Sequence, residues 1–110
     1  MDTRNKYVRQ SYYLKNRLEV LEHYGGVPPK CKCCGEEEVK FLSIDHIDGG
    51  GKEHRAKTGS NYIAWFKKNN FPNGFQILCH NCNLAKGFYQ ECPHQTTPIT
   101  VEELFANDNL

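Results

Sequence analysis

The sequence predicts an α+β fold, in which two short strands are surrounded by helices. Residues 39–47 and 75–79 are rich in apolar and β-branched side chains and end at glycine or at a turn, which is typical of strands. Residues 3–24 and 60–69 instead carry apolar residues at helical spacing. A chain of 110 residues favours one domain. Its core is small enough that an additional crosslink is expected.

The first predicted helix covers residues 3–24. Thr3 can cap its start, and Gly25 with Gly26 ends it. Four of its apolar residues fall on one stripe: Tyr7, Leu14, Leu18 and Leu21. Its basic residues lie mostly off this stripe, where they either contact nucleic acid or keep the helix soluble: Arg4, Arg9, Lys15 and Arg17.

Further helices are predicted on either side of the second strand. Ser60 can cap a short helix inserted between the strands. Trp65 in this helix is expected to pack into the core, with stacking on a nucleic-acid base as the less favoured alternative. A closing helix is predicted over residues 83–90. The last sixteen residues are polar, with one helical candidate at 101–106 behind Thr100.

Two cysteine pairs with equal spacing predict a metal site. Cys31 and Cys34 form one Cys-x-x-Cys turn, and Cys79 and Cys82 form another. Two such turns can complete the tetrahedral shell of a structural zinc ion. Cys33 competes with Cys34, and the equal spacing of the pairs favours Cys34. A disulfide framework is the alternative, and it would require an oxidising compartment.

Charge and hydropathy suggest where the protein works. No stretch is long and apolar enough to span a bilayer, and the first residues do not resemble a signal peptide, so a cytoplasmic protein with reduced thiols is expected. Basic residues outnumber acidic ones in 1–32 and 49–88, around an acidic patch at 33–48. Basic blocks are typical of proteins that bind phosphate backbones, although a solvated surface explains them equally well.

A chemically distinctive pair lies between the cysteine turns. Asp45 and His46 end the first predicted strand and precede the flexible run Gly49–Gly51. A zinc ion joining the two cysteine turns would bring this pair toward residues 83–86. A carboxylate and a histidine at one place suit cation binding and proton transfer.

In this combination the chain resembles the HNH, or ββα-metal, endonuclease family. The resemblance covers roughly residues 27 to 94. It is carried by Cys31 and Cys34, by "DHIDGG" at 45–50 and by "LCHNCNLAKG" at 78–87. It implies a ββα-metal fold with an N-terminal helix and a short helix inserted between the strands.

The resemblance also implies the roles of individual residues. Asp45 and Asn83 would hold a catalytic divalent cation, Mg²⁺ or Mn²⁺, and His46 would be the general base. The implied activity is hydrolysis of DNA phosphodiester bonds to a 3′-hydroxyl and a 5′-phosphate. Four residues are candidates for contact with the nucleic acid: Lys52, His54, Arg55 and Lys86.

The chain departs from the family pattern at one position. Many members carry an asparagine five residues before the third cysteine, where it orients the base, and this chain has Gly74. A branch that cuts branched DNA also tolerates glycine there and ends its knuckle in Cys-Asn, as this chain does. Asn73 or Gln76 are possible substitutes. In addition, Asp45 and His46 converge only if the strand ends or kinks, because neighbours on a regular strand point to opposite faces.

The expected organisation has three parts. Residues 1–26 form a basic helix, 27–94 form the nuclease domain with structural zinc, and 95–110 form a polar tail. Cys92 and His94 could form part of a metal site, but they are expected to be structural or free. Two other functions are compatible with the sequence: a non-catalytic zinc-knuckle module that binds nucleic acid or protein, and an accessory nickase active only within a larger phage or recombination complex.

Overall fold

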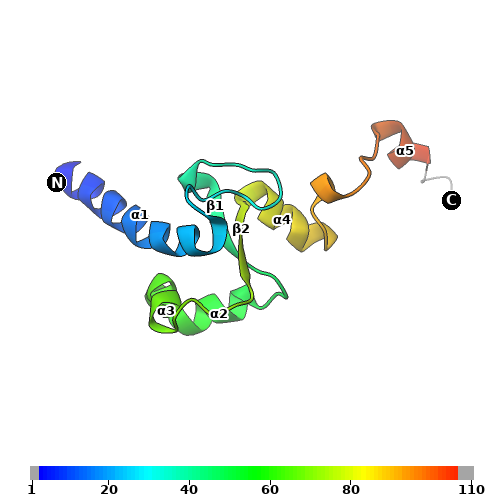
Figure 1. Ribbon diagram of the computed structural model, residues 1–110. Coiled ribbons are helices and arrows are strands. Elements are labelled where there is room, and N and C mark those ends of the chain that lie inside the picture. Colours follow the sequence, from blue (N-terminus) through cyan, green and yellow to red (C-terminus); the bar gives the residue numbers. More distant parts are fainter. Residues whose placement is uncertain (1–2, 107–110) are drawn as a thin grey trace.

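The computed structural model describes residues 3–106 and confirms a small α+β domain with two antiparallel strands and several helices (Figure 1). Every helix in this range is too short or too polar to cross a bilayer. The elements, in chain order, are α1 (Thr3–Gly25), η1 (Val39–Phe41), β1 (Leu42–His46), α2 (Gly51–Thr58), η2 (Gly59–Asn61), α3 (Tyr62–Lys68), β2 (Phe75–Cys79), α4 (His80–Tyr89), η3 (Pro93–Gln95) and α5 (Val101–Ala106).

The sheet consists of β1 and β2 in antiparallel register, from Leu42 opposite Cys79 to His46 opposite Phe75. Side chains alternate between its two faces. One face carries Leu42 and Ile44 of β1, and the buried residues of this face belong to the hydrophobic core. The other face carries Ser43 and Asp45 and lies toward α4, because Asn83 and Lys86 of that helix bond to these two side chains.

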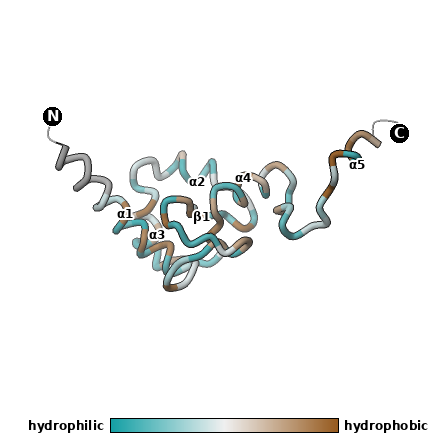
Figure 2. Tube along the Cα trace, turned by 90° about the horizontal axis from the view of Figure 1, so that it is seen from above, coloured by the Kyte–Doolittle hydropathy of each residue, from teal (hydrophilic) through white to brown (hydrophobic). Residues whose placement is uncertain are grey.

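The core lies between the sheet, α1 and α3. Val20 and Leu21 of α1 and Phe66 of α3 are fully buried there. Gly25 allows the close approach of α1 to the sheet, because a Cβ at this position would lie 2.9 Å from the Cγ1 of Ile77. Figure 2 shows hydrophobic segments of α1 and α3 side by side on this part of the molecule. The burial of apolar surface therefore fixes the N-terminal helix against the sheet.

The predicted N-terminal helix is confirmed with one change in its buried residues. It ends at Gly25, one residue later than predicted. Val20, which lies off the predicted stripe, is fully buried, whereas Leu14 and Leu18 are only half-buried. The predicted cap Thr3 and the side chains of Arg4, Tyr7 and Arg9 lie outside the side chains that the structure describes.

Other element boundaries differ from the predictions. The predicted strand 39–47 begins with the 3-10 turn η1, so β1 starts only at Leu42. The basic segment after the glycine run is helix α2 and not a loop; it follows Gly50, whose φ of 90° favours glycine. Helix α3 starts at Tyr62, and Ser60 lies in η2 before it.

Helix α4 begins three residues earlier than predicted, because Cys79 caps it. The Sγ of Cys79 accepts a hydrogen bond from the backbone N–H of Cys82. The predicted helix at 101–106 is confirmed as α5, and the Oγ1 of Thr100 accepts a bond of 3.1 Å from the N–H of Glu103. Figure 1 shows α5 at the opposite end of the molecule from the start of α1. Residues 107–110 of the predicted tail lie outside the described range.

Candidate metal centre and catalytic site

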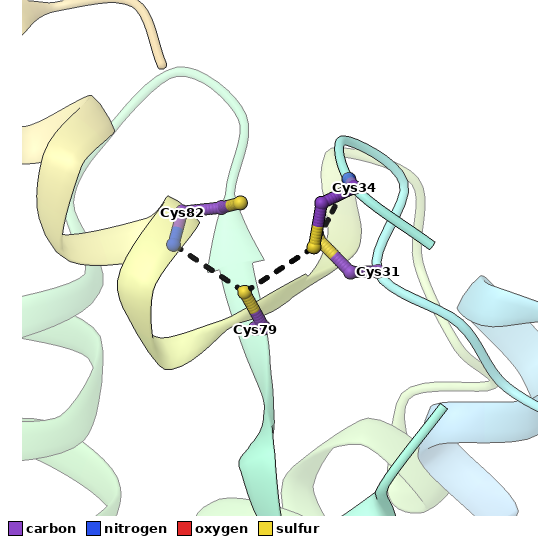
Figure 3. Close-up of side chains that lie close together, drawn as sticks. All are labelled: Cys31, Cys34, Cys79 and Cys82. Carbon is purple, nitrogen blue, oxygen red and sulfur yellow. Dashed lines mark hydrogen bonds between the residues drawn. The ribbon is translucent and has the colours of Figure 1, made fainter. Parts of the chain in front are cut away.

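The four cysteines of the two predicted turns lie together at one end of the sheet (Figure 3). Cys31 and Cys34 come from the loop after α1, Cys79 ends β2, and Cys82 lies in the first turn of α4. Their sulfur atoms all lie within 4.8 Å of one another. The Sγ atoms of Cys34 and Cys79 are 3.7 Å apart, close to the separation of about 3.8 Å that two thiolates adopt on one tetrahedral zinc ion.

The chemistry of this group fits a metal such as zinc. All six cysteines are free thiols, so no disulfide competes for these sulfurs. Burial opposes ionisation of Cys31, but backbone N–H groups that point at its sulfur, from Cys34 first, bring its pKa down to about 7. Burial raises the pKa of Cys82, and the neighbouring thiols raise it further. A bound metal ion would hold both as thiolates.

A second group of possible ligands lies beside the first. It contains Cys33, Cys82, Cys92 and His94, with ligand atoms again within 4.8 Å of one another. The sequence treats Cys33 as a competitor of Cys34, but the structure assigns the two to different groups. The sequence indicated that Cys92 and His94 could form part of a metal site, but favoured a structural or free role for them. Their approach to Cys33 and Cys82 was not predicted, because only the fold brings these residues together.

The predicted catalytic residues line one small hollow beside β1. This hollow has a volume of about 180 Å³ and is lined by the three residues predicted to carry the chemistry, together with basic and glycine positions after the strand. The lining residues are Ile44, Asp45, His46, Gly49, Gly51, Lys52, Arg55 and Asn83. A carboxylate, an imidazole, an amide and two cationic side chains therefore share a single space.

Asp45 is the most deeply buried charged residue of this hollow, with 7 % of its surface exposed. Its Oδ2 accepts a hydrogen bond of 2.8 Å from Gln76 and one of 2.6 Å from the ammonium group of Lys86. Both bonds fall on Oδ2, so Oδ1 is the oxygen left for a cation. Lys86 places a positive charge beside the carboxylate to which a divalent ion would also bind.

Asn83 is held by the neighbouring strand. Its Nδ2 donates a hydrogen bond of 3.0 Å to the Oγ of Ser43, which in turn donates to the carbonyl of Leu78. This chain of bonds fixes the amide plane with Oδ1 as the free atom. Oxygen is the donor that Mg²⁺ and Mn²⁺ prefer, so Asn83 fits the role of a cation ligand.

His46 lies on the opposite face of the strand from Asp45, as the alternation of a regular strand requires. Its ring packs edge-on against Phe75, with centroids 4.8 Å apart. A Cβ on Gly51 would lie 3.0 Å from the Nδ1 of His46, so this nitrogen faces the glycine side of the hollow. The pairing of β1 with β2 is regular through Asp45 and His46, and the strand ends at His46, where both residues line the same hollow.

His54 orients the ring of His46. Its Nδ1 lies 2.7 Å from the Nε2 of His46, and its ring packs edge-on against Trp65 at 4.1 Å. Burial lowers the pKa of both histidines; the charge of Arg55 lowers both further, and at His46 these effects outweigh Asp45. His46 is therefore held as a neutral imidazole near pH 7.

The remaining predicted contacts divide into two classes. Lys52 and Arg55 are exposed at the rim of the hollow and are free to reach a ligand. The ammonium group of Lys86 instead also donates to the carbonyls of His46 and Ile47, so it braces the turn after β1. The expectation that His54 contacts phosphate does not match its half-buried position among aromatic rings.

The two substitutes considered for the missing asparagine at Gly74 do not touch His46 in the described hydrogen bonds. Gln76 donates to Asp45, its partner across the strands, and Asn73 lies in the exposed turn. Sequence reasoning missed His54 in this role. A histidine eight residues after His46 is only a signal if the segment between them folds back, and α2 was not predicted.

A larger hollow of about 490 Å³ lies on the outer side of α4 and is lined largely by Leu84, Gly87 and Phe88. It contains Asn83 but neither Asp45 nor His46. Size alone would favour this hollow, but reactive groups gather in the smaller one. We therefore treat the smaller hollow as the candidate catalytic site.

Comparison of the chain with protein-family models, with curated proteins and with solved structures gave no match.

Proposed function

We propose that the protein is a metal-dependent endonuclease of the HNH, or ββα-metal, type that hydrolyses phosphodiester bonds in DNA. His46 serves as the general base, and Asp45 and Asn83 hold a Mg²⁺ or Mn²⁺ ion. A zinc ion on Cys31, Cys34, Cys79 and Cys82 has a structural role, because a closed shell of four thiolates leaves no position for water or substrate.

The observation that carries this proposal is the shared hollow. Asp45, His46 and Asn83 line one space of about 180 Å³, although Asp45 and His46 lie on opposite sheet faces and Asn83 lies far from both in sequence. Each has the oxygen or nitrogen atom that its proposed role requires. The exposed cations Lys52 and Arg55 at the rim supply positive charge where a phosphate would enter. The chain order of the three proposed catalytic residues, with Asp45 and His46 on a strand and Asn83 on a later helix, agrees with the resemblance to the HNH family.

The tautomer of the histidine pair supports a base at His46. If Nε2–H of His46 donates to Nδ1 of His54, the lone pair of His46 lies on Nδ1, which faces the hollow. The Nε2 of His54 then carries a proton. This atom is buried and has no hydrogen-bond partner among the described residues, and it lies among aromatic rings. An N–H group can form weak contacts with such rings, whereas a lone pair cannot.

The reaction then follows from the positions of these groups. Nδ1 of His46 removes a proton from a water molecule, whose oxygen forms the new bond to phosphorus. The bond from phosphorus to the 3′-oxygen breaks, which leaves a 5′-phosphate and, after protonation from water, a 3′-hydroxyl. Asp45 and Asn83 would hold the divalent cation, which would supply positive charge to the reacting phosphate. His54 orients the base.

One observation favours a non-catalytic zinc-knuckle module instead. The ion pair between Lys86 and Asp45, at 2.6 Å, gives the buried carboxylate a structural partner. The carboxylate can therefore be buried without binding a divalent cation. In that case Asp45 and His46 have no chemical role. The two functions differ in a simple way, because a binding module cleaves no DNA under any condition.

The test is incubation of the purified chain with supercoiled plasmid and with branched DNA in the presence of Mg²⁺, Mn²⁺ or Ca²⁺. We expect cleavage with Mg²⁺ or Mn²⁺. Asp45→Asn and Asn83→Ala should cleave slowly and recover partly at high cation concentration, because they weaken cation binding without removing the base. His23→Ala, a variant of an exposed histidine on α1, is the matched control and should cleave like the wild type. Absence of cleavage with every cation and substrate would contradict the proposal.

A further inference from the structure

The cluster around His94 has the geometry of a metal site in its own right. The Nδ1 of His94 lies 3.5 Å from the Sγ of Cys33, 3.4 Å from that of Cys82 and 3.3 Å from that of Cys92. On a tetrahedral zinc ion, with bonds of about 2.3 Å to sulfur and about 2.0 Å to nitrogen, these atoms would be about 3.5 Å apart. The three observed separations agree with this value.

Hydrogen bonding alone accounts poorly for this arrangement. A ring nitrogen has either one proton or one lone pair, so Nδ1 can form a good hydrogen bond with one of the three sulfurs and not with all of them. One ion at the centre explains three similar distances at once. The donor set of three sulfurs and one imidazole nitrogen is also a common structural zinc shell.

The two groups meet at Cys82. This residue belongs to the group with Cys31, Cys34 and Cys79 and also to the group with His94. A thiolate sulfur has enough lone pairs to bind two ions. We infer that the protein binds two zinc ions in one cluster, bridged by the thiolate of Cys82. Cys33, Cys92 and His94 complete the coordination shell of the second ion.

The surroundings suit such a cluster. Two divalent ions and six thiolates leave a net charge of about −2, which needs donors nearby. Backbone N–H groups of Cys34 and Cys82 point at the sulfurs of Cys31 and Cys79 at 3.4 and 3.5 Å. Among the ligands of the second ion, the sulfur of Cys33 accepts a hydrogen bond of 3.3 Å from the side-chain amide of Gln95.

The second ion would fasten the segment after α4 to the rest of the domain. This segment forms the short 3-10 turn η3, which has no buried residue of its own, and only the preceding Cys92 is buried. The ion would join it to the loop after α1 through Cys33 and to α4 through Cys82. This role is independent of the proposed nuclease activity.

The experiment is native mass spectrometry of the full chain loaded with zinc at neutral pH. We expect two zinc ions in the wild type. Cys92→Ser combined with His94→Ala should bind one ion and stay folded, because the first group of four cysteines is intact. The control His80→Ala changes an exposed histidine that belongs to neither group and should bind two. A wild type that binds one ion, or a double variant that still binds two, would overturn the inference.

The bridge is tested by replacing zinc with ¹¹³Cd. In a proton–cadmium correlation spectrum, the β-protons of Cys82 should couple to two cadmium signals. Those of Cys79 should couple to one of these signals, and those of Cys92 should couple to the other. Coupling of Cys82 to a single cadmium signal would overturn the shared thiolate.

Discussion

At the scale of single residues, the site depends on the groups that compensate the negative charge of the buried Asp45 carboxylate. A carboxylate with 7 % of its surface exposed is costly to bury unless it is paired. Lys86 and Gln76 provide that pairing on one oxygen. The same lysine binds the carbonyls of His46 and Ile47, so one ammonium group connects the carboxylate, the strand end and helix α4.

We predict that Lys86→Met destabilises the protein by roughly 1–3 kcal/mol, because it leaves a buried carboxylate without its ionic partner. Asp45→Asn should cost less, because the neutral amide can still bond to Gln76. The double variant should recover part of the loss caused by Lys86→Met. Urea unfolding of the zinc-loaded proteins measures these differences in the free energy of unfolding. If the single lysine variant is as stable as the wild type, the ion pair is not a structural contact.

The half-buried histidine pair makes stability depend on pH. Burial lowers the pKa of His46 and His54 below the usual value, so the unfolded chain binds protons at these residues more readily than the folded chain. Their contribution to stability is complete above about pH 6.5, the usual pKa of histidine, and is lost progressively as the pH falls below it. We therefore expect the unfolding free energy to decrease from pH 7.5 to 5.5.

Release of metal in acid also destabilises the fold, so a comparison isolates the histidines. The difference in unfolding free energy between the wild type and a His46→Gln/His54→Gln variant should itself shrink as the pH falls, because only the wild type must protonate these half-buried rings. A constant difference for the double variant would remove these histidines from the explanation.

At the scale of elements, local sequence predicted what local forces determine. Strand β2 has its predicted bounds, and α1 ends within one residue of the prediction, because apolar periodicity and glycine stops act locally. Helix α2 was not predicted, since its start depends on Gly49 and Gly50 adopting positive φ values of 84° and 90°, and its side chains show no apolar stripe.

The placement of α2 changes which basic residues are expected to contact DNA. The sequence pattern left Arg17 of α1 available, but its guanidinium donates to the carbonyl of Leu42 at 2.9 Å and joins α1 to β1. Lys52 and Arg55 of α2, in contrast, are exposed beside Asp45 and His46. Contact with phosphate is therefore expected mainly from α2.

We predict that Lys52→Gln combined with Arg55→Gln reduces the slope of log affinity against log salt by about 2, because each phosphate contact contributes about 0.9. Binding of a DNA duplex is measured in Ca²⁺ at several salt concentrations. Lys68→Gln, on the exposed end of α3, should leave the slope unchanged. An equal slope for the double variant and the wild type would exclude α2 from the DNA interface.

At the scale of the whole molecule, the sequence predicted the parts of the site that come from short motifs. The cysteine turns and the pair Asp45–His46 are readable as patterns, and the fold brings the four predicted cysteines together. The contact of His54 with His46 and the approach of His94 to Cys33 could not be predicted, because each joins segments whose relative position depends on packing.

Hydrolysis by this assembly is proposed to use His46 as the base. The most direct measurement is the single-turnover rate of plasmid cleavage in Mg²⁺ or Mn²⁺ by the wild type and His46→Ala, with DNA affinity measured separately in Ca²⁺ and zinc content checked by mass spectrometry. We expect unchanged affinity and zinc content and a rate at least about 10² lower, the usual minimum for loss of a positioned acid–base group. A His46→Ala protein that cleaves at the wild-type rate would contradict it.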